Sequence, residues 1–364
     1  PNVISVFEVL VMLTVFSFFF LTCIIITVVG YYFRRKWAKQ RILDRQGVLK
    51  AEQYSKLITI KDILNDPYIP NIKWQDIKLD KRIGRGASGL VWSAKWNRGN
   101  GTEDIAAKEL LMSVDEMGQE KLHEFFREIK LTSALVHKKI VKFIGISVPD
   151  DTDGIYLITE LMHRGSLREL LDKVHNLSWD VRLKFAIDAA KGVEYLHNRG
   201  LIHRDLKTSN LLVNQDCVCK VADFGISTVK RGSSEEKKIV GTPLYMAPEV
   251  LRYNDYSKAA DVYAWGIIIH EIYTKQYPYS EPMYSGWHIN HLTYQIAHHG
   301  IRPDCSSINN IVKQLILDCL NEDPELRPTF KEIVARLKRI KKMKLKIDNE
   351  DYTTVDSSRS LSDL

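Results

Sequence analysis

The hydrophobic pattern begins with a continuous apolar stretch near the start of the chain. Residues 9–29, VLVMLTVFSFFFLTCIIITVV, contain no charged side chain. A helix of this length, rising about 1.5 Å per residue, would cross a hydrocarbon core of roughly 30 Å. A buried core helix should instead show a polar face, and the few polar residues here are Ser and Thr, which can bond to their own helix backbone. We therefore predict a transmembrane helix over residues 9–33.

The charges that follow this stretch predict its orientation. Basic residues dominate the next segment, with only Asp44 opposing them: Arg34, Arg35, Lys36, Lys39, Arg41 and Arg45. By the positive-inside rule this side faces the cytoplasm, which leaves residues 1–8 as an extracellular stub. A cleaved signal peptide would carry its positive charge before a shorter apolar core. We read residues 34–74 as a basic juxtamembrane segment and membrane lipid as a partner of it.

Beyond Pro70 the pattern changes to short alternating segments. Residues 77–96 alternate around three glycines, which predicts two strands joined by a Gly-rich turn, and residues 104–110 predict a third strand. The stretch 122–131 then shows helical spacing. Its apolar positions are Leu122, Phe125, Phe126 and Ile129. The pattern indicates a strand-rich lobe with one helix.

From Ser166 onward helical patterns dominate. We expect one helix from about Ser178 to Gly200, a second over residues 261–273 and a third over residues 330–340. Residues 341–364 turn Lys-rich and then Ser/Asp-rich, which predicts a disordered tail. The predicted fold class is α+β, with a strand-rich lobe, a helical lobe and one preceding transmembrane helix.

Composition and charge limit the function classes. The chain has 364 residues, 45% of them hydrophobic and 27% charged, with a net charge of +7. This charge is not accompanied by a basic stripe with interleaved aromatic residues, so we expect no nucleic-acid partner. Five scattered cysteines do not form a disulfide framework.

The first candidate functional motif is a glycine motif, G-x-G-x-x-G-x-V. It consists of Gly84, Gly86, Gly89 and Val91. Glycines let backbone amides approach phosphate oxygens without a Cβ in the way, but similar spacing opens dinucleotide-binding folds. A dinucleotide motif runs from a strand directly into a helix. Here the glycines lie between predicted strands and Lys108 follows on a third, which favours a different phosphate-binding site.

Further motifs follow in a fixed order along the chain. They are IAAK at 105–108, HRDLKTSN at 203–210, ADFG at 222–225, GTPLYMAPE at 241–249 and DPELRPTF at 323–330. With these motifs, residues from about 74 to 340 resemble a protein kinase domain of the tyrosine-kinase-like branch. The domain is predicted over residues 75–340, with ATP and Mg²⁺ as cofactors. Together with the predicted transmembrane helix, the architecture resembles a receptor-like kinase.

The resemblance implies a role for each catalytic residue. Lys108 would hold the α- and β-phosphates and pair with Glu128 of the first helix. Asp205 would accept the proton of the substrate hydroxyl, and Asn210 and Asp223 would bind magnesium. Nucleotide-binding roles extend over Ile83, Gly84, Arg85, Gly86, Gly89, Val91, Ala106, Lys108, Thr159, Glu160 and Met162. Among these, Thr159 stands in the gatekeeper position and the stretch from Glu160 to Met162 would offer backbone groups to adenine.

Two residues bear on which hydroxyl is phosphorylated. In the family, Lys207 and Thr242 accompany serine/threonine specificity, because the Lys contacts the transferring phosphate and the Thr hydroxyl is tied to the catalytic Asp. Some members of this branch also act on tyrosine, so dual-specificity or tyrosine kinase activity is the alternative. A catalytically weak scaffold is a further alternative, which the presence of Lys108, Asp205 and Asp223 disfavours. Protein substrates, and a homodimer or receptor complex, are the implied partners.

The same resemblance implies supporting residues. Glu249 would pair with Arg327, Asp261 would support the catalytic loop, and His203 would be structural. Thr132 stands where the family usually has Leu or Met, in an apolar stack with Phe143, His203 and Phe224, and we hypothesise that it weakens this stack and lowers basal activity. Candidate phosphorylation sites, with Arg204 as the expected phosphate partner, are Ser227, Thr228, Ser233 and Ser234.

Overall fold

The computed structural model describes residues 59–86, 89–110, 119–150, 154–223, 242–281 and 286–351. All of them belong to the second of the chain's two units, Ile58–Leu364. The predicted transmembrane segment 9–33, with its flanks 1–8 and 34–58, lies outside these ranges. Within the ranges themselves, every helix is too short or too polar to cross a membrane.

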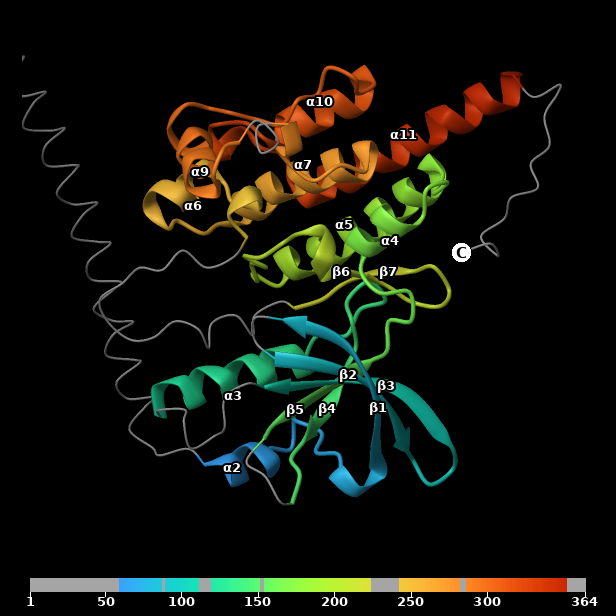
Figure 1. Cartoon of the computed structure of the whole chain (residues 1–364), viewed down its shortest axis with the longest axis vertical. Coiled ribbons are helices and arrows are strands. Elements are labelled where there is room, and N and C mark those ends of the chain that lie inside the picture. Colours follow the sequence, from blue (N-terminus) through green and yellow to red (C-terminus); the bar gives the residue numbers. More distant parts are fainter. Residues whose placement is uncertain are drawn as a thin grey trace, which may run out of the picture. The chain divides into compact units, whose positions relative to one another are not determined.

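The first lobe is built on an antiparallel sheet with the strand order β1-β2-β3-β5-β4 (Figure 1). Its strands are β1 (Ile77–Gly86), β2 (Gly89–Asn97), β3 (Thr102–Leu110), β4 (Phe143–Ser147) and β5 (Tyr156–Glu160). The motif glycines lie in the β1–β2 hairpin, where Gly86 pairs with Gly89. The chain therefore passes from strand to strand at this motif, as predicted, and not from strand to helix as in a dinucleotide fold.

Two helices complete the first lobe. Helix α3 (Gln119–Ser133) buries Leu122, Phe125 and Ile129 at helical spacing, as the sequence pattern predicts. The short helix α2 (Ile60–Leu64) precedes the sheet, and a 3₁₀ turn, η1 (Trp74–Asp76), leads into β1. The predicted strand-rich lobe with one main helix is confirmed.

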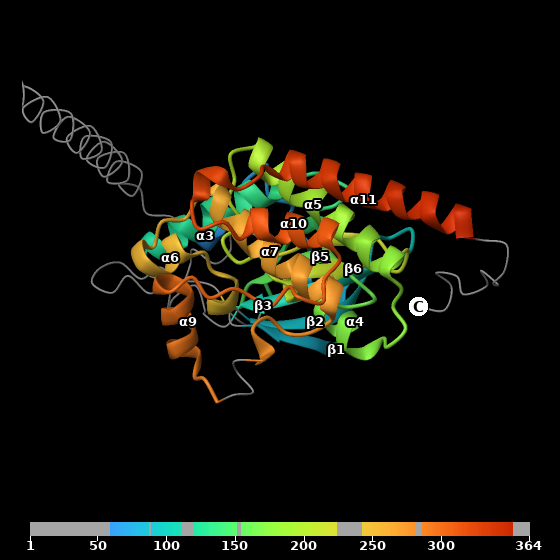
Figure 2. The same cartoon turned by 90° about the horizontal axis from the view of Figure 1, so that it is seen from above.

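The second lobe is helical (Figures 1 and 2). Its helices are α4 (Leu167–Lys173), α5 (Trp179–Asn198), α6 (Pro248–Tyr253), α7 (Lys258–Thr274), α9 (Ile289–His298), α10 (Asn310–Cys319) and α11 (Phe330–Asp351). A small hairpin, β6 (Leu211–Val213) with β7 (Cys219–Val221), lies on the side of this lobe that faces the first lobe. The predicted start of α5 is confirmed, because the Ser178 side chain accepts a hydrogen bond from the Val181 amide.

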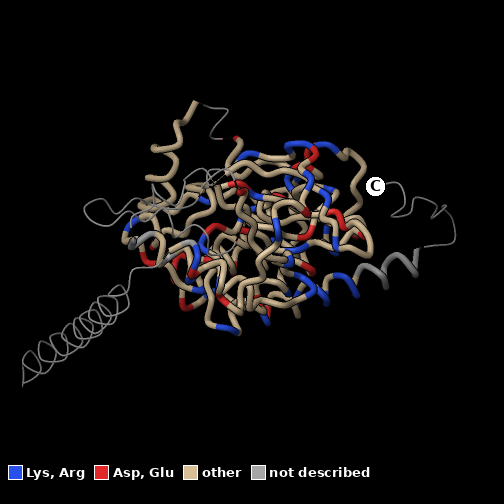
Figure 3. Tube along the Cα trace, turned by 90° about the horizontal axis from the view of Figure 1, so that it is seen from below, with Lys and Arg blue, Asp and Glu red and all other residues tan. Residues whose placement is uncertain are grey.

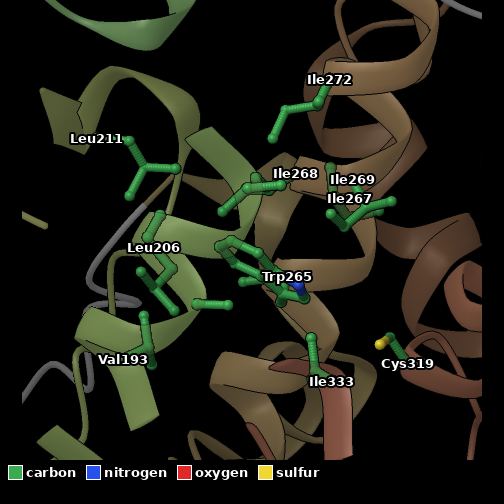
Figure 4. Packing of buried hydrophobic residues seen from close by; sticks show 14 of the residues in the cluster. Val193, Leu206, Leu211, Trp265, Ile267, Ile268, Ile269, Ile272, Cys319 and Ile333 are labelled. Carbon is green, nitrogen blue, oxygen red and sulfur yellow. The ribbon is translucent and has the colours of Figure 1, made fainter. Parts of the chain in front are cut away.

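Helix α7 forms the centre of the second lobe (Figure 4). Most of its residues are buried, and both Tyr263 and Trp265 are fully enclosed. The Trp265 ring packs edge-on against Phe330 of α11 at 5.5 Å. A Cβ on Gly266 would lie 2.8 Å from Leu320 Cδ2, so glycine allows this close approach. Because α7 is packed from several sides, it is a fixed support for the loops above it.

The end of the chain departs from the prediction. A disordered tail was expected over residues 341–364, yet α11 continues to Asp351. Residues 330–351 contain no Gly or Pro, and the apolar positions Ile333, Leu337 and Ile340 keep helical spacing. Lys-rich composition alone does not end a helix, since Lys is a good helix former. Residues 352–364 lie outside the described part of the chain.

Positions of both charge signs are interspersed along the described chain (Figure 3). Several exposed ion pairs lie on it, among them Lys95–Asp104 at 2.9 Å and Arg98–Glu103 at 3.0 Å. Pairs of this kind contribute little to stability because water screens both charges.

Candidate active site

The catalytic loop, residues 203–210, lies between α5 and β6 and is held from below by Asp261. This aspartate is 2% exposed and stands in the first turn of α7. Its carboxylate accepts the backbone N–H groups of His203 at 2.8 Å and Arg204 at 3.0 Å. His197 Nε2 lies 2.8 Å from the same carboxylate. The loop is therefore anchored to the buried helix α7, as predicted for Asp261.

Two residues beside the site have left-handed backbone conformations. Arg204 has φ = 71° and Asp223 has φ = 53°. Residues other than glycine rarely adopt this region, and such strain persists only where the surroundings enforce it. At Arg204 the enforcing contact is the N–H bond to Asp261. The His203 side chain donates to the Ala222 carbonyl at 2.9 Å and is 1% exposed, which agrees with a structural role.

Asp205 is the centre of a dense polar cluster. Lys207 Nζ lies 2.8 Å from Asp205 Oδ2 and 2.8 Å from Thr242 Oγ1. The Thr242 backbone N–H and hydroxyl both donate to Asp205 Oδ1, at 3.1 and 3.3 Å. Asn210 Nδ2 donates to the Asp205 carbonyl at 2.8 Å. The cluster brings together the aspartate that was predicted to be catalytic and both residues on which the specificity prediction depends.

Lys108 connects this cluster to the first lobe. It comes from β3, and its Nζ donates to Asp223 Oδ1 at 2.7 Å, across 115 positions of sequence. Side-chain exposure is 14% for Lys108 and 51% for Asp223, so the carboxylate is open to solvent. The sequence assigned Glu128 as the partner of Lys108. The ion pairs found within the described residues include Lys108–Asp223 and no pair between Lys108 and Glu128, which is 7% exposed in α3.

The donor groups of Asn210 and Asp223 fit a magnesium ion. The Asn210 N–H groups face Asp205, which leaves the amide oxygen of Asn210 for a cation. The Ala222 N–H donates to the Asn210 carbonyl at 2.9 Å, which holds the end of β7 and hence Asp223 against the catalytic loop. One carboxylate and one amide oxygen are the few hard ligands that magnesium takes from proteins beside phosphate.

The residues assigned to nucleotide binding lie on β1, β2, β3 and β5, except Met162, which follows β5. Gly84 pairs with Val91 across the hairpin, and Ala106 pairs with Thr159. Ile83 is 44% exposed, and Arg85 is also exposed. Gly89 has a structural reason to be glycine, because a Cβ there would lie 1.9 Å from the Glu109 carbonyl oxygen of β3.

Several hydrogen bonds hold the segment that joins the lobes. The Glu160 backbone N–H donates to the Lys142 carbonyl at 3.0 Å, so this N–H is already used within the protein. The Glu160 side chain is held by Lys220 Nζ at 2.7 Å. Met162 is 7% exposed and its carbonyl accepts from the Gly165 N–H at 3.1 Å.

A second ion pair supports the loop that ends at Glu249. Both carboxylate oxygens of Glu249 accept from Arg327, at 2.7 and 2.9 Å, and the Arg327 side chain is fully enclosed. The planar guanidinium makes the two-point contact that a lysine could not make. The predicted Glu249–Arg327 pair is therefore present.

Sequence reasoning missed a buried network below the catalytic loop. Glu271 of α7 is 0% exposed and accepts from Arg168 Nη1 at 2.9 Å, from Tyr245 Oη at 2.7 Å and from Thr208 Oγ1 at 3.1 Å. Burial raises the pKa of Glu271 to about 7 although these groups donate to it. A glutamate inside the apolar run WGIIIHEIY was the available signal.

Several predicted residues fall outside the described ranges. They are Phe224 and the candidate phosphorylation sites Ser227, Thr228, Ser233 and Ser234. Thr132, whose hydroxyl was expected to weaken an apolar stack, is 8% exposed in the last turn of α3. That hypothesis stays a prediction.

Comparison with known proteins agrees with this geometry. Residues 77–337 match the family model of protein tyrosine and serine/threonine kinase. The chain is 40% identical over 277 residues to probable serine/threonine-protein kinase drkA of Dictyostelium discoideum, covering 74% of this chain and 40% of that protein.

Plant proteins are similar over the same region. Identity is 38% over 278 residues to probable serine/threonine-protein kinase SIS8 of Arabidopsis thaliana, covering 74% of this chain and 26% of the relative. It is 32% over 274 residues to serine/threonine-protein kinase STY17 of the same plant, covering 74% and 45%. The chain thus spans less than half the length of each of these relatives.

Proposed function

The chain belongs to the protein tyrosine and serine/threonine kinase family, and we propose from this that it transfers the γ-phosphoryl group of ATP to serine and threonine hydroxyls of proteins. The observation that carries the proposal is the contact of Lys207 with both Asp205 and Thr242, each at 2.8 Å. The names of relatives such as drkA and STY17 also describe serine/threonine kinases.

The cluster around Asp205 supports a defined reaction. Asp205 accepts the proton of the substrate hydroxyl as its oxygen attacks the γ-phosphorus and the bond to the ADP oxygen breaks. Thr242 and Lys207 hold the Asp205 carboxylate in place, and the Lys207 side chain would contact the transferring group. Asn210 and Asp223 would hold a magnesium ion, which would supply positive charge beside the phosphates.

We also propose that the kinase is attached to a membrane in receptor-type signalling. The support is the uncharged stretch of residues 9–29 and the basic cluster that follows it, which together favour one span with the kinase domain on the cytoplasmic side.

A phosphorylation assay tests the catalytic proposal. The whole chain, incubated with Mg-ATP and a generic protein substrate, is expected to incorporate phosphate into serine and threonine. Asp205→Ala should lower kcat by about 10²–10⁴, because the proton acceptor is lost. Asp216→Ala, which removes an exposed carboxylate from the β6–β7 turn, is the matched control and should leave kcat unchanged.

Phosphoamino-acid analysis of the product decides specificity. Predominant phosphotyrosine would contradict the serine/threonine assignment and favour the tyrosine-kinase alternative. Absence of any incorporation, by wild type and control alike, would favour a scaffold that does not transfer phosphate.

A further inference from the structure

A segment that precedes the family match is built into the first lobe. This N-terminal segment, residues 59–72, contains α2 and ends before the match begins at residue 77. Thr59 starts α2 with a capping box, since its hydroxyl accepts from the Asp62 amide and the Asp62 carboxylate accepts from the Thr59 amide at 2.8 Å. The helix lies beside α3 and the β4 edge of the sheet (Figure 1).

The segment contributes to the hydrophobic core beneath α3. Ile63 and Ile69 are 0% and 2% exposed. They belong to one buried cluster with residues of α3, of the sheet and of the position just before β5: Leu122, Phe125, Ile129, Ile146, Leu157 and Ile155. The inner face of α3 therefore packs on the N-terminal segment as well as on the strands.

An ion pair joins the segment to the exposed side of α3. Lys130 Nζ donates to Asp66 Oδ2 at 2.8 Å and lies 5.1 Å from the centre of the Tyr68 ring. The Asp66 side chain is only 10% exposed, and its other oxygen accepts from the Tyr68 amide at 2.9 Å. Donation by Lys130 lowers the pKa of Asp66, so the pair is charged near neutral pH.

Backbone bonds fix the same segment to β4. The Ile146 N–H donates to the Pro70 carbonyl at 2.9 Å, and the Ile72 N–H donates to the Ile146 carbonyl at 2.8 Å. A Cβ on Gly145 would lie 2.4 Å from the Pro70 oxygen, so glycine at this position lets the segment approach. The segment is thus anchored to the sheet at one end and to α3 at the other.

We propose that residues 59–72 position α3, and that Ile63 and Asp66 are positioning residues for phosphoryl transfer. Helix α3 carries Glu128, two positions before Lys130, and Glu128 is the family partner of Lys108. Displacing the anchor of Lys130 therefore displaces Glu128 relative to the phosphate-binding lysine. The inference rests on the proposed kinase function. It also implies that a force on the chain before residue 59 would act on α3 through residues 59–72.

The test compares variants of the whole chain by kinase kinetics and by amide hydrogen exchange in α3. Ile63→Ala is expected to lower kcat/KM about tenfold or more, since small misplacements of catalytic groups have large effects. Asp66→Asn and Lys130→Gln should each lower it about two- to fivefold. The double variant should be no worse than either single variant, because both remove one interaction. Exchange of α3 amides should accelerate in all of them.

Two matched controls separate positioning from general stability. Ile333→Ala removes an equally buried isoleucine from α11, and Glu103→Gln removes the Arg98 ion pair from the β2–β3 hairpin. Ile333→Ala should lower the midpoint temperature of unfolding, as Ile63→Ala does. At assay temperatures below this midpoint, however, it should leave amide exchange in α3 and kcat/KM unchanged. Glu103→Gln should change neither.

The inference is overturned if Ile63→Ala and Asp66→Asn match these controls in α3 exchange and in kcat/KM. A wild type that transfers no phosphate contradicts the proposed function alone. Hydrogen exchange then decides the inference: faster α3 exchange in the variants supports it, and unchanged exchange overturns it.

Discussion

Two glycines of one motif, Gly84 and Gly89, have different surroundings. A Cβ on Gly84 would meet Val91 Cβ at 3.7 Å, an ordinary contact, whereas on Gly89 it would lie 1.9 Å from the Glu109 carbonyl oxygen. That oxygen belongs to the backbone of β3 and cannot move without opening the β2–β3 pairing. The fold therefore requires glycine at residue 89, whereas at residue 84 only the predicted approach of a phosphate would require it.

This difference predicts opposite behaviour of two alanine variants. Gly89→Ala should lower the free energy of unfolding by about 1–3 kcal/mol through the clash with β3. Gly84→Ala should keep or slightly raise stability, yet raise KM for ATP because a methyl group blocks the approach of phosphate. Thermal unfolding and ATP titration of both variants check this. If both variants lost the same amount of stability, the two glycines would not differ in their structural roles.

The positions of the residues predicted to be catalytic follow from the sequence, but not all their partners do. Asp205, Lys207 and Asn210 lie within one short loop, so a local motif was enough to bring them together. The resemblance assigned Glu128 to Lys108, while the structure pairs Lys108 with Asp223. The partner of a long flexible lysine depends on how the two lobes approach each other, and no local pattern encodes that approach.

At the scale of elements, Glu271 links helices and turns that are distant in sequence. It lies on α7 and accepts from Arg168 of α4, Thr208 of η2 (Thr208–Asn210) and Tyr245 of η4 (Pro243–Tyr245). Among these elements, periodicity predicted the helix that became α7, because its apolar run is long enough to show a helical pattern. It could not predict the network, because the network depends on four elements meeting at one buried carboxylate.

The raised pKa of Glu271 predicts a pH-dependent stability. Below its ordinary value near 4.5 the carboxyl group is protonated in both states. As the pH rises to about 7 the unfolded state loses the proton while the folded state keeps it, so the free energy of unfolding falls, by up to about 3 kcal/mol. Glu271→Gln removes this titration. Denaturant unfolding between pH 5 and 7 should show wild type losing stability relative to the variant.

A matched control isolates this effect from other titrating groups. Glu325→Gln changes an exposed glutamate of the same lobe, in η5 (Pro324–Leu326). The stability difference between wild type and this control should stay constant with pH. If the stability difference between wild type and Glu271→Gln were also constant with pH, burial would not raise the pKa of the Glu271 carboxyl group.

For the whole molecule, the order of motifs predicted the two lobes, and the family match over residues 77–337 lies within the predicted domain 75–340. What lies at its edges was not predicted. Residues 59–72 were assigned to the basic juxtamembrane segment 34–74, yet Ile63 and Ile69 are buried against α3. Short segments that owe their structure to tertiary packing carry little local signal.

The predicted membrane attachment concerns the first unit, residues 1–57, and is tested on the whole chain. If residues 9–33 span a bilayer, the expressed protein should stay in the membrane pellet after alkaline carbonate extraction. Phe19→Arg with Ile25→Arg should release it, because each arginine near the helix centre costs about 2.5–3.5 kcal/mol on insertion. Phe19→Leu with Ile25→Leu keeps the hydrophobicity and should stay in the pellet. Wild-type protein in the supernatant would contradict the transmembrane proposal and leave the kinase proposal to its own assay.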